Sequence, residues 1–195
     1  LEQAIPILRD VDDRQALVNT LSNLASVAHF ETEVLGELSY RQLADLSAEA
    51  LQIARGFNWD QGEARALIPG AISLSQTGEY ARALDWLSRA KALTETMGHR
   101  ETFALLQLTS GQILMGLLAL TEARQQLEAG LALAQELGAG FLTLTATAGL
   151  ARTSVLQNDL AGARELLDAR LPTEFPEGRM TIHERRLWGG RAELE

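Results

Sequence analysis

The sequence contains no cysteine, which excludes disulfide bonds, thiolate-bound zinc, iron–sulfur clusters and a cysteine nucleophile. Proline is scarce, with four residues in 195, and no segment alternates apolar and polar residues for long, so little β-sheet is expected. No apolar run approaches the 18 residues that a membrane-spanning helix needs, and we expect no membrane partner. Basic residues are also few: 17 lysines and arginines stand against 26 acidic residues, and the net charge of −9 argues against direct binding of nucleic acid.

Residues that could bind a metal or catalyse a reaction are present, but they do not have the spacing in the sequence that such sites require. The histidines His29, His99 and His183 lie far apart, and none forms a recognised metal-binding pattern with a residue three or four positions away. The chain has neither a P-loop pattern nor a G-x-S-x-G nucleophile elbow. Its many carboxylates are expected to form a solvated surface. We therefore expect no catalytic residue, no metal, no cofactor and no enzymatic activity.

What the sequence does contain is an internal repeat of 40 residues. Small and large apolar positions recur together in three copies: Ala83, Ala123 and Ala163, with Leu87, Leu127 and Leu167. Helix-ending residues recur with the same spacing at Asn58, Gly98 and Gly138, because glycine and asparagine tolerate the left-handed backbone that closes a helix. A period in this range is typical of repeat architectures, in which each unit buries its apolar face against its neighbours.

Between these stops the apolar residues follow helical spacing. Capping-box patterns mark two helix starts, at Ser39-x-x-Gln42 and at Asp60-x-x-Glu63. The predicted helices are 2–10, then the pairs 13–29 with 39–56, 60–77 with 79–97, 100–117 with 119–137 and 141–157 with 159–171, then a linker at 172–178 and a last helix at 179–195. The predicted organisation is one repeat domain over 1–195, with a partial repeat at 1–12, repeats at about 13–58, 59–98, 99–138 and 139–178, and a partial repeat at 179–195.

Residues 46–93 resemble tetratricopeptide repeats, most closely the variety of roughly 40 residues found in MalT-like and LuxR-type bacterial transcription activators and related signalling proteins. The residues that carry the resemblance are Gly78, Tyr80, Ala83, Leu87 and Ala90, with Gly111, Ala123 and Leu127 in the next copy. The resemblance implies an all-α fold, a right-handed superhelical solenoid of antiparallel helix pairs with a concave face. It also implies a cytoplasmic protein–protein interaction or regulatory scaffold within a larger bacterial protein. The alternative that it leaves open is a domain that senses a small molecule or a peptide.

Two positions depart from the repeat pattern. Leu118 stands where neighbouring copies have Gly78 and Asn158, so we expect that turn to be built differently. Pro69 lies well inside a predicted helix, and proline there removes a hydrogen bond and clashes one turn back. We therefore expect a kink at Ile68–Gly70, or an early break in that helix. A tolerated kink against a neighbouring helix and a functional opening of the groove are both consistent with the sequence.

The first helix of each pair is expected to line the concave face, on which a protein or peptide partner would bind. In the family register this face presents Asn19, Ser22, Ser26, His29, Arg65, Ile68, Ile72, Gln76, Leu105, Leu108, Gln112, Met115, Thr145, Ala148, Arg152 and Val155. Its centre is apolar, and Arg65 and Arg152 are isolated positive points. The sequence leaves open a groove that binds nothing alone and only relays strain within a larger protein.

The chain ends suggest further contacts. The sequence begins at Leu1 without an initiator methionine and with part of a helix, so we interpret it as a fragment of a longer array. Self-association through the two cut terminal helices is therefore a second expectation. Of the tryptophans, Trp86 is predicted to pack in the core and Trp59 to cover the joint between two helix pairs, whereas Trp188 is the best candidate for a partner contact.

Overall fold

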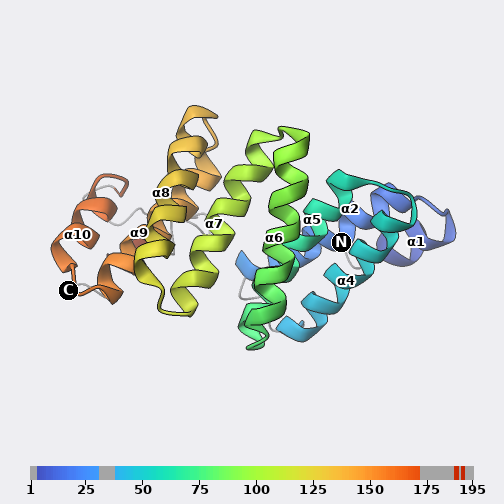
Figure 1. Ribbon diagram of the computed structural model, residues 1–195, viewed down its shortest axis with the longest axis horizontal. Helices are drawn as coiled ribbons and strands as arrows, with labels where there is room; N and C mark the ends of the chain where they lie inside the picture. Colours follow the sequence, from blue (N-terminus) through green and yellow to red (C-terminus); the bar gives the residue numbers. More distant parts are fainter. Residues whose placement is uncertain (1–3, 31–37, 172–186, 189, 192–195) are drawn as a thin grey trace. The chain divides into compact units, whose positions relative to one another are not determined.

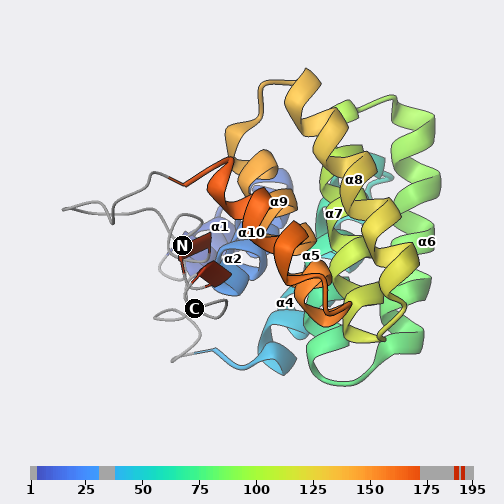
Figure 2. The same cartoon turned by 90° about the vertical axis from the view of Figure 1, so that its left-hand side faces the viewer.

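The computed structural model describes residues 4–30, 38–171, 187, 188, 190 and 191, and this part of the chain is helical, with short turns and no strand (Figures 1 and 2). The helices are α1 (Ala4–Asp10), α2 (Arg14–Phe30), α4 (Tyr40–Gly56), α5 (Asp60–Gln76), α6 (Tyr80–Met97), α7 (Arg100–Gly116), α8 (Leu120–Glu136), α9 (Gly140–Leu156) and α10 (Leu160–Asp168). The all-α prediction is confirmed for these residues. The predicted linker at 172–178 and most of the predicted last helix lie outside them.

The helix boundaries follow the sequence prediction closely. From α2 to α9 they differ from it by at most one residue at either end, while α10 ends at Asp168 instead of residue 171. Helices that follow one another in the chain pack together: α1 on α2, α2 on α4, α4 on α5, α5 on α6, α8 on α9 and α9 on α10. The first helices of two successive pairs, α2 and α5, also touch. Consecutive packing of this kind is what a helical repeat requires.

The contacts divide the chain into two compact units, Leu1–Thr109 and Ser110–Glu195, with the boundary inside α7. The first unit, called unit 1 below, contains α1 to α6 and the first ten residues of α7. The second unit, unit 2, contains the end of α7 followed by α8, α9 and α10. Each unit thus holds at least one complete antiparallel helix pair together with part of the next.

Small residues allow helices to approach closely inside both units. The small positions predicted from the repeat, Ala83, Ala123 and Ala163, are buried, and so are the large ones, Leu87, Leu127 and Leu167. In unit 2, Leu127 of α8 fits between two glycines: a Cβ on Gly111 would lie 2.5 Å from its Cγ, and one on Gly149 would lie 2.9 Å from its Cδ2. Glycine at these two positions therefore makes room for one leucine.

Trp86 of α6 makes a similar close contact with a glycine in unit 1, one position before the repeat equivalent of Leu127. It is buried as predicted, and its ring lies so close to Gly70 of α5 that a Cβ there would overlap it. Ser47 of α4 lies on the same glycine, and its own Cβ would be only 2.7 Å from a Cβ added to Gly70. Trp59 lies at the joint between α4 and α5, where its ring stacks on Phe57 with the centroids 5.8 Å apart.

Every described turn between consecutive helices from α4 to α10 contains one residue with left-handed backbone. These residues are spaced by twenty, at Asn58, Gly78, Gly98, Leu118, Gly138 and Asn158. The predicted stops at Asn58, Gly98 and Gly138 are therefore confirmed. Because a left-handed residue redirects the chain within about three positions, successive helices of nearly equal length can pack antiparallel.

The prediction that the turn at Leu118 is built differently is wrong. Leu118 has φ 59°, close to the 61° of Asn158, and its backbone N–H donates to Met115 over 3.0 Å just as that of Asn158 donates to Val155 over 2.9 Å. A leucine in this conformation brings its Cβ close to the backbone, at a cost of about 1 kcal/mol that glycine avoids. The turn therefore has the same backbone geometry as the turn at Asn158, although this geometry is strained for a leucine.

The two predicted helix starts have different outcomes. Ser39 and Gln42 form the expected capping box: the backbone N–H of Ser39 donates to Gln42 Oε1 over 2.8 Å, and that of Gln42 donates to Ser39 Oγ over 3.3 Å. The box at Asp60 and Glu63 is wrong, because Asp60 is already the first residue of α5, the N-cap is Trp59, and no side chain caps the helix. The Glu63 carboxylate instead pairs with Arg55 at 3.0 Å and Arg89 at 3.6 Å.

Pro69 lies within one uninterrupted helix. α5 runs from Asp60 to Gln76 with Pro69 buried inside it, so the predicted early break is wrong, while the kink stays a prediction. One turn later, the Ser73 hydroxyl donates to the Pro69 carbonyl over 3.1 Å. The dense packing of Gly70 against α4 and α6 holds the helix across the proline.

Candidate functional site

The sixteen candidates for the concave face are distributed between surface and interior. Five are buried: Ser22, Ile68, Leu108, Met115 and Thr145. Eight are half-buried: Asn19, Ser26, Arg65, Ile72, Leu105, Gln112, Ala148 and Val155. Gln76 and Arg152 are exposed, and the side chain of His29 lies outside the described residues. The buried five serve packing between helices, which leaves the half-buried and exposed ones to meet a ligand.

Thr145 and Met115 show how the interior members are used. The Thr145 hydroxyl donates to the Phe141 carbonyl one turn earlier in α9 over 3.0 Å. Met115, near the end of α7, accepts a hydrogen bond on its Sδ from the Thr153 hydroxyl of α9 over 3.6 Å. Met115 therefore joins two first helices of unit 2 instead of facing a groove, since both of these side chains are buried.

Arg65 is the charged centre of the candidate face in unit 1. It lies on α5, and its Nη2 donates to Asn23 Oδ1 of the adjoining helix α2 over 3.1 Å. Its Nε is buried and has no hydrogen-bond partner. Within the described part of the chain no carboxylate pairs with it, so a half-buried guanidinium is held here by one neutral amide. A buried donor without a partner is uncommon in folded proteins, and because Nε itself is buried, an acceptor from outside the chain would have to bind the Nη groups.

Other arginines of the chain behave differently. Seven of them pair with carboxylates within the described residues: Arg9, Arg14, Arg55, Arg82, Arg89, Arg124 and Arg191. The guanidinium of Arg82, through its hydrogen bond to Glu79, lowers the pKa of that carboxyl below its ordinary value. Arg152, the exposed candidate on α9, has no such pair among the described residues. Arg65 and Arg152 therefore have no carboxylate partner among the described residues, and their place on a concave face stays a prediction.

Ser22 of α2 gives the face a second unsatisfied group. Its Oγ is buried without a hydrogen-bond partner, as is Ser47 Oγ on α4. Ser22 precedes Asn23, the residue that holds Arg65, so two of the three described buried side-chain atoms without a partner belong to sequence-predicted candidates on α2 and α5. Both of these atoms are buried, so the structure leaves them without a partner but does not expose them to a ligand.

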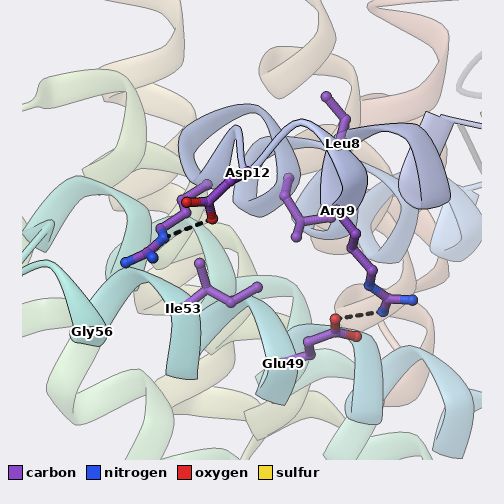
Figure 3. A pocket seen from close by; sticks show the side chains of 8 residues that line it. Leu8, Arg9, Asp12, Glu49, Ile53 and Gly56 are labelled. Carbon is purple, nitrogen blue, oxygen red and sulfur yellow. Dashed lines mark hydrogen bonds and ion pairs between the residues drawn. The ribbon is translucent and has the colours of Figure 1, made fainter.

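A cleft of about 370 Å³ on unit 1 was missed by the sequence reasoning. It lies between α1, the start of α2 and α4, and none of its lining residues is among the sixteen candidates: Leu8, Arg9, Asp12, Arg14, Leu17, Glu49, Ile53 and Gly56 (Figure 3). The ion pair of Arg9 with Glu49 joins α1 to α4 across it, and a local pair of Arg14 with Asp12 lies at the start of α2. No pattern in the sequence indicated it, because Arg9 and Glu49, which pair at the cleft, are 40 residues apart and come together only when α1 packs near α4.

The ends of the chain differ in how much apolar surface they leave. Ile7 of α1 and Val11 in the turn that follows it are exposed. Near the other end, Leu187 is 1% exposed and packs in a cluster with Ala151, Leu167 and Leu171. Trp188 packs against the same cluster, with the Arg191 guanidinium 5.3 Å from its ring centroid. A partner could therefore meet only part of Trp188, whereas the outer side of α1 is open.

Within the described residues, no group of three or more histidine or acidic side chains is arranged to hold a metal ion. No helix there combines the length and the apolar character needed to cross a bilayer. In comparisons with known proteins, the sequence matches no protein-family model and no curated protein.

Proposed function

We propose that the chain is a tetratricopeptide-like interaction domain, a right-handed superhelical stack that binds a protein or peptide segment along the faces of its first helices. The consecutive packing of helix pairs and the left-handed residue at each turn support this fold. The proposal gives the chain a scaffold or regulatory role within a larger cytoplasmic bacterial protein. It assigns no catalysis, no cofactor and no direct contact with nucleic acid.

The observation that carries the proposal is Arg65. A half-buried arginine without a carboxylate partner is costly on its own, and the remaining donors of its fork fit a carboxylate. Ile72 and Gln76, farther along α5, continue the accessible part of the face with an apolar and a polar group. The segment that fits is therefore an extended or helical peptide with an acidic residue beside apolar ones.

Peptide selection tests this proposal. Random 15-residue peptides displayed on phage are selected on the immobilised chain, and the enriched peptides are then measured by fluorescence polarisation. We expect acidic residues next to apolar ones, and about tenfold weaker binding by R65Q, because a charge-assisted hydrogen bond contributes about 1.5–3 kcal/mol. R14Q is the matched control, since Arg14 is exposed and already paired with Asp12.

Enriched peptides without acidic residues, or equal binding by R65Q and the original chain, contradict the proposal. Circular dichroism establishes that both variants keep their helices.

The cleft on unit 1 favours the second candidate function, the sensing of a small molecule. If R14Q abolishes binding of a selected peptide while R65Q does not, the peptide binds at the cleft and the proposed site around Arg65 is wrong.

A further inference from the structure

Leu118 combines two features that folding stability does not explain. It holds a strained left-handed backbone at a position where Asn58, Gly78 and Asn158 avoid or reduce the strain. It is also 71% exposed, so its side chain gains little from packing within the chain. Strain that the fold does not need is often kept for function. The side chain of Leu118 is therefore a candidate contact for something outside the chain.

Leu118 belongs to an apolar edge at one end of unit 2. Leu117 and Leu118 form the turn between α7 and α8, and Leu156 and Leu160 flank the turn between α9 and α10; they are 39%, 71%, 45% and 50% exposed. Both turns lie at the lower end of this unit in Figures 1 and 2. We call these four residues the leucine edge.

Arg124 fixes the two turns side by side. From the second turn of α8 its Nη2 donates to Ser154 Oγ over 2.8 Å and to Gln157 Oε1 over 2.7 Å, and its Nε donates to the same Gln157 oxygen over 3.1 Å. Ser154 and Gln157 belong to the end of α9 and the turn that follows it. The leucine edge is therefore held in place by the fold, and a partner meets a preformed surface.

The size of the leucine edge indicates what covers it. Its four side chains together expose about as much surface as two fully exposed leucines. A stable interface between two folded copies buries roughly 800 Å² on each side, several times more than this. Two copies, each with a net charge of −9, would also repel one another. A short segment with a few apolar side chains matches the area better than a second copy.

The charges beside the leucine edge indicate the chemistry of that segment. Glu122 in the first turn of α8 and Asp159 at the N-cap of α10 are both exposed. Arg124 is occupied by Gln157 and Ser154, and Arg152 lies one turn before Leu156 on the first-helix side. Glu122 and Asp159 therefore add two exposed carboxylates close in sequence to Leu118 and Leu160, and these attract a positively charged flank.

We propose that the leucine edge is a second interaction surface, which binds a short amphipathic helix with leucine-like side chains on one face and lysine or arginine beside them. It is separate from the first-helix face around Arg65, and neither proposal depends on the other. Docked in this way, the apolar face of the helix covers Leu118 and Leu156, while its basic flank lies against Glu122 and Asp159.

A labelled synthetic helix of leucine and lysine is the probe, and fluorescence polarisation with the full chain is the measurement. Two further peptides, one with glutamate in place of lysine and one with serine in place of leucine, separate charge from apolar contact. We expect the leucine–lysine peptide to bind at least tenfold more tightly than either. L118N should weaken it by about tenfold, because a large part of one leucine contact is lost.

L118N distinguishes an interaction surface from a structural role, because it changes binding and stability in opposite directions. Asparagine tolerates the left-handed backbone, so the thermal midpoint of L118N should rise by a few degrees while its affinity falls. L118M keeps an apolar side chain and should keep the affinity. L137A, at the turn between α8 and α9, changes another exposed leucine and should leave binding unchanged.

Equal affinity of the chain for the leucine–lysine and leucine–glutamate peptides overturns the proposal, as does unchanged binding by L118N. Light scattering tests whether a second copy of the chain occupies the leucine edge instead. If the chain self-associates and L118N alone makes it monomeric, the occupant is a second copy and the proposed helix is wrong. Because the probe and the variants avoid Arg65, failure here leaves the proposed function of the first-helix face standing, and the reverse also holds.

Discussion

At the scale of the residue, left-handed backbone at the turns determines which side chains are tolerated. Gly138, between α8 and α9, has φ 63° and open space beyond its Cα, so only its backbone conformation restricts it. Gly56, the last residue of α4, has the same open space without a left-handed backbone. Neither glycine has a neighbour that an added Cβ would meet, so a comparison of the two isolates the effect of the left-handed backbone.

Alanine at these two positions should have opposite effects. We expect G138A to lower the free energy of unfolding by about 1 kcal/mol, because an L-residue is strained at positive φ. G56A should raise it by about 0.5 kcal/mol, because alanine loses less backbone entropy in a helix. Urea denaturation followed by circular dichroism measures both. A loss at Gly56 as large as that at Gly138 would show that the turn conformation is not the cause.

At the scale of the element, close contacts at glycine set how helices pack. Gly70 brings α5 against Trp86 of α6 and Ser47 of α4, and the helix continues through Pro69 at the same place. Added volume must move the tryptophan ring or separate the helices, because interiors are densely packed. The packing of three helices in unit 1 therefore depends on one missing methyl group.

We expect G70A to lower the free energy of unfolding of unit 1 by about 1–3 kcal/mol through overpacking. In the G70A background, W86F should recover part of this loss, because the smaller ring vacates the space that the new Cβ takes. A double-mutant cycle in guanidinium measures the coupling, which we expect to exceed about 0.5 kcal/mol. Strictly additive losses would mean that the ring and the methyl group do not compete for the same space.

At the scale of the whole molecule, contacts are made between neighbours along the chain, and they separate into two units. In such an array, stability is close to a sum over repeats and their interfaces, so damage stays local. Hydrogen exchange followed by mass spectrometry should show that G70A speeds exchange in α4, α5 and α6 and leaves α8, α9 and α10 nearly unchanged. A uniform increase over both units would indicate that the chain unfolds in one cooperative step.

Much of this fold was predictable because the pattern repeats. Helix boundaries, the stops at Asn58, Gly98 and Gly138 and the buried leucines follow from a 40-residue period combined with helical spacing. The Asp60 cap and the Leu118 turn were predicted wrongly for one physical reason: contacts elsewhere override local preference. Trp59 is the N-cap of α5 in place of Asp60, and the shared turn geometry is kept although Leu118 is strained.

The candidate site was less predictable, because a helix register indicates a face and not the depth of each side chain. Arg65 and Arg152 were recognised as isolated charges, yet Met115 and Thr145 of the same face are buried in contacts between helices. The cleft beside α1 depends on Arg9 and Glu49, which are 40 residues apart. Such pairings come from three-dimensional stacking, and no local pattern in the sequence encodes them.

The leucine that fits between two glycines in unit 2 has an evolutionary consequence. Leu127 fills the volume left free by Gly111 on α7 and by Gly149 on α9. The side chains at these three positions therefore compete for the same space. A change at any of them is tolerated only if the others adjust. Related domains with alanine at both glycine positions should therefore carry a shorter residue such as valine at the third, and the three should vary together as one inherited group.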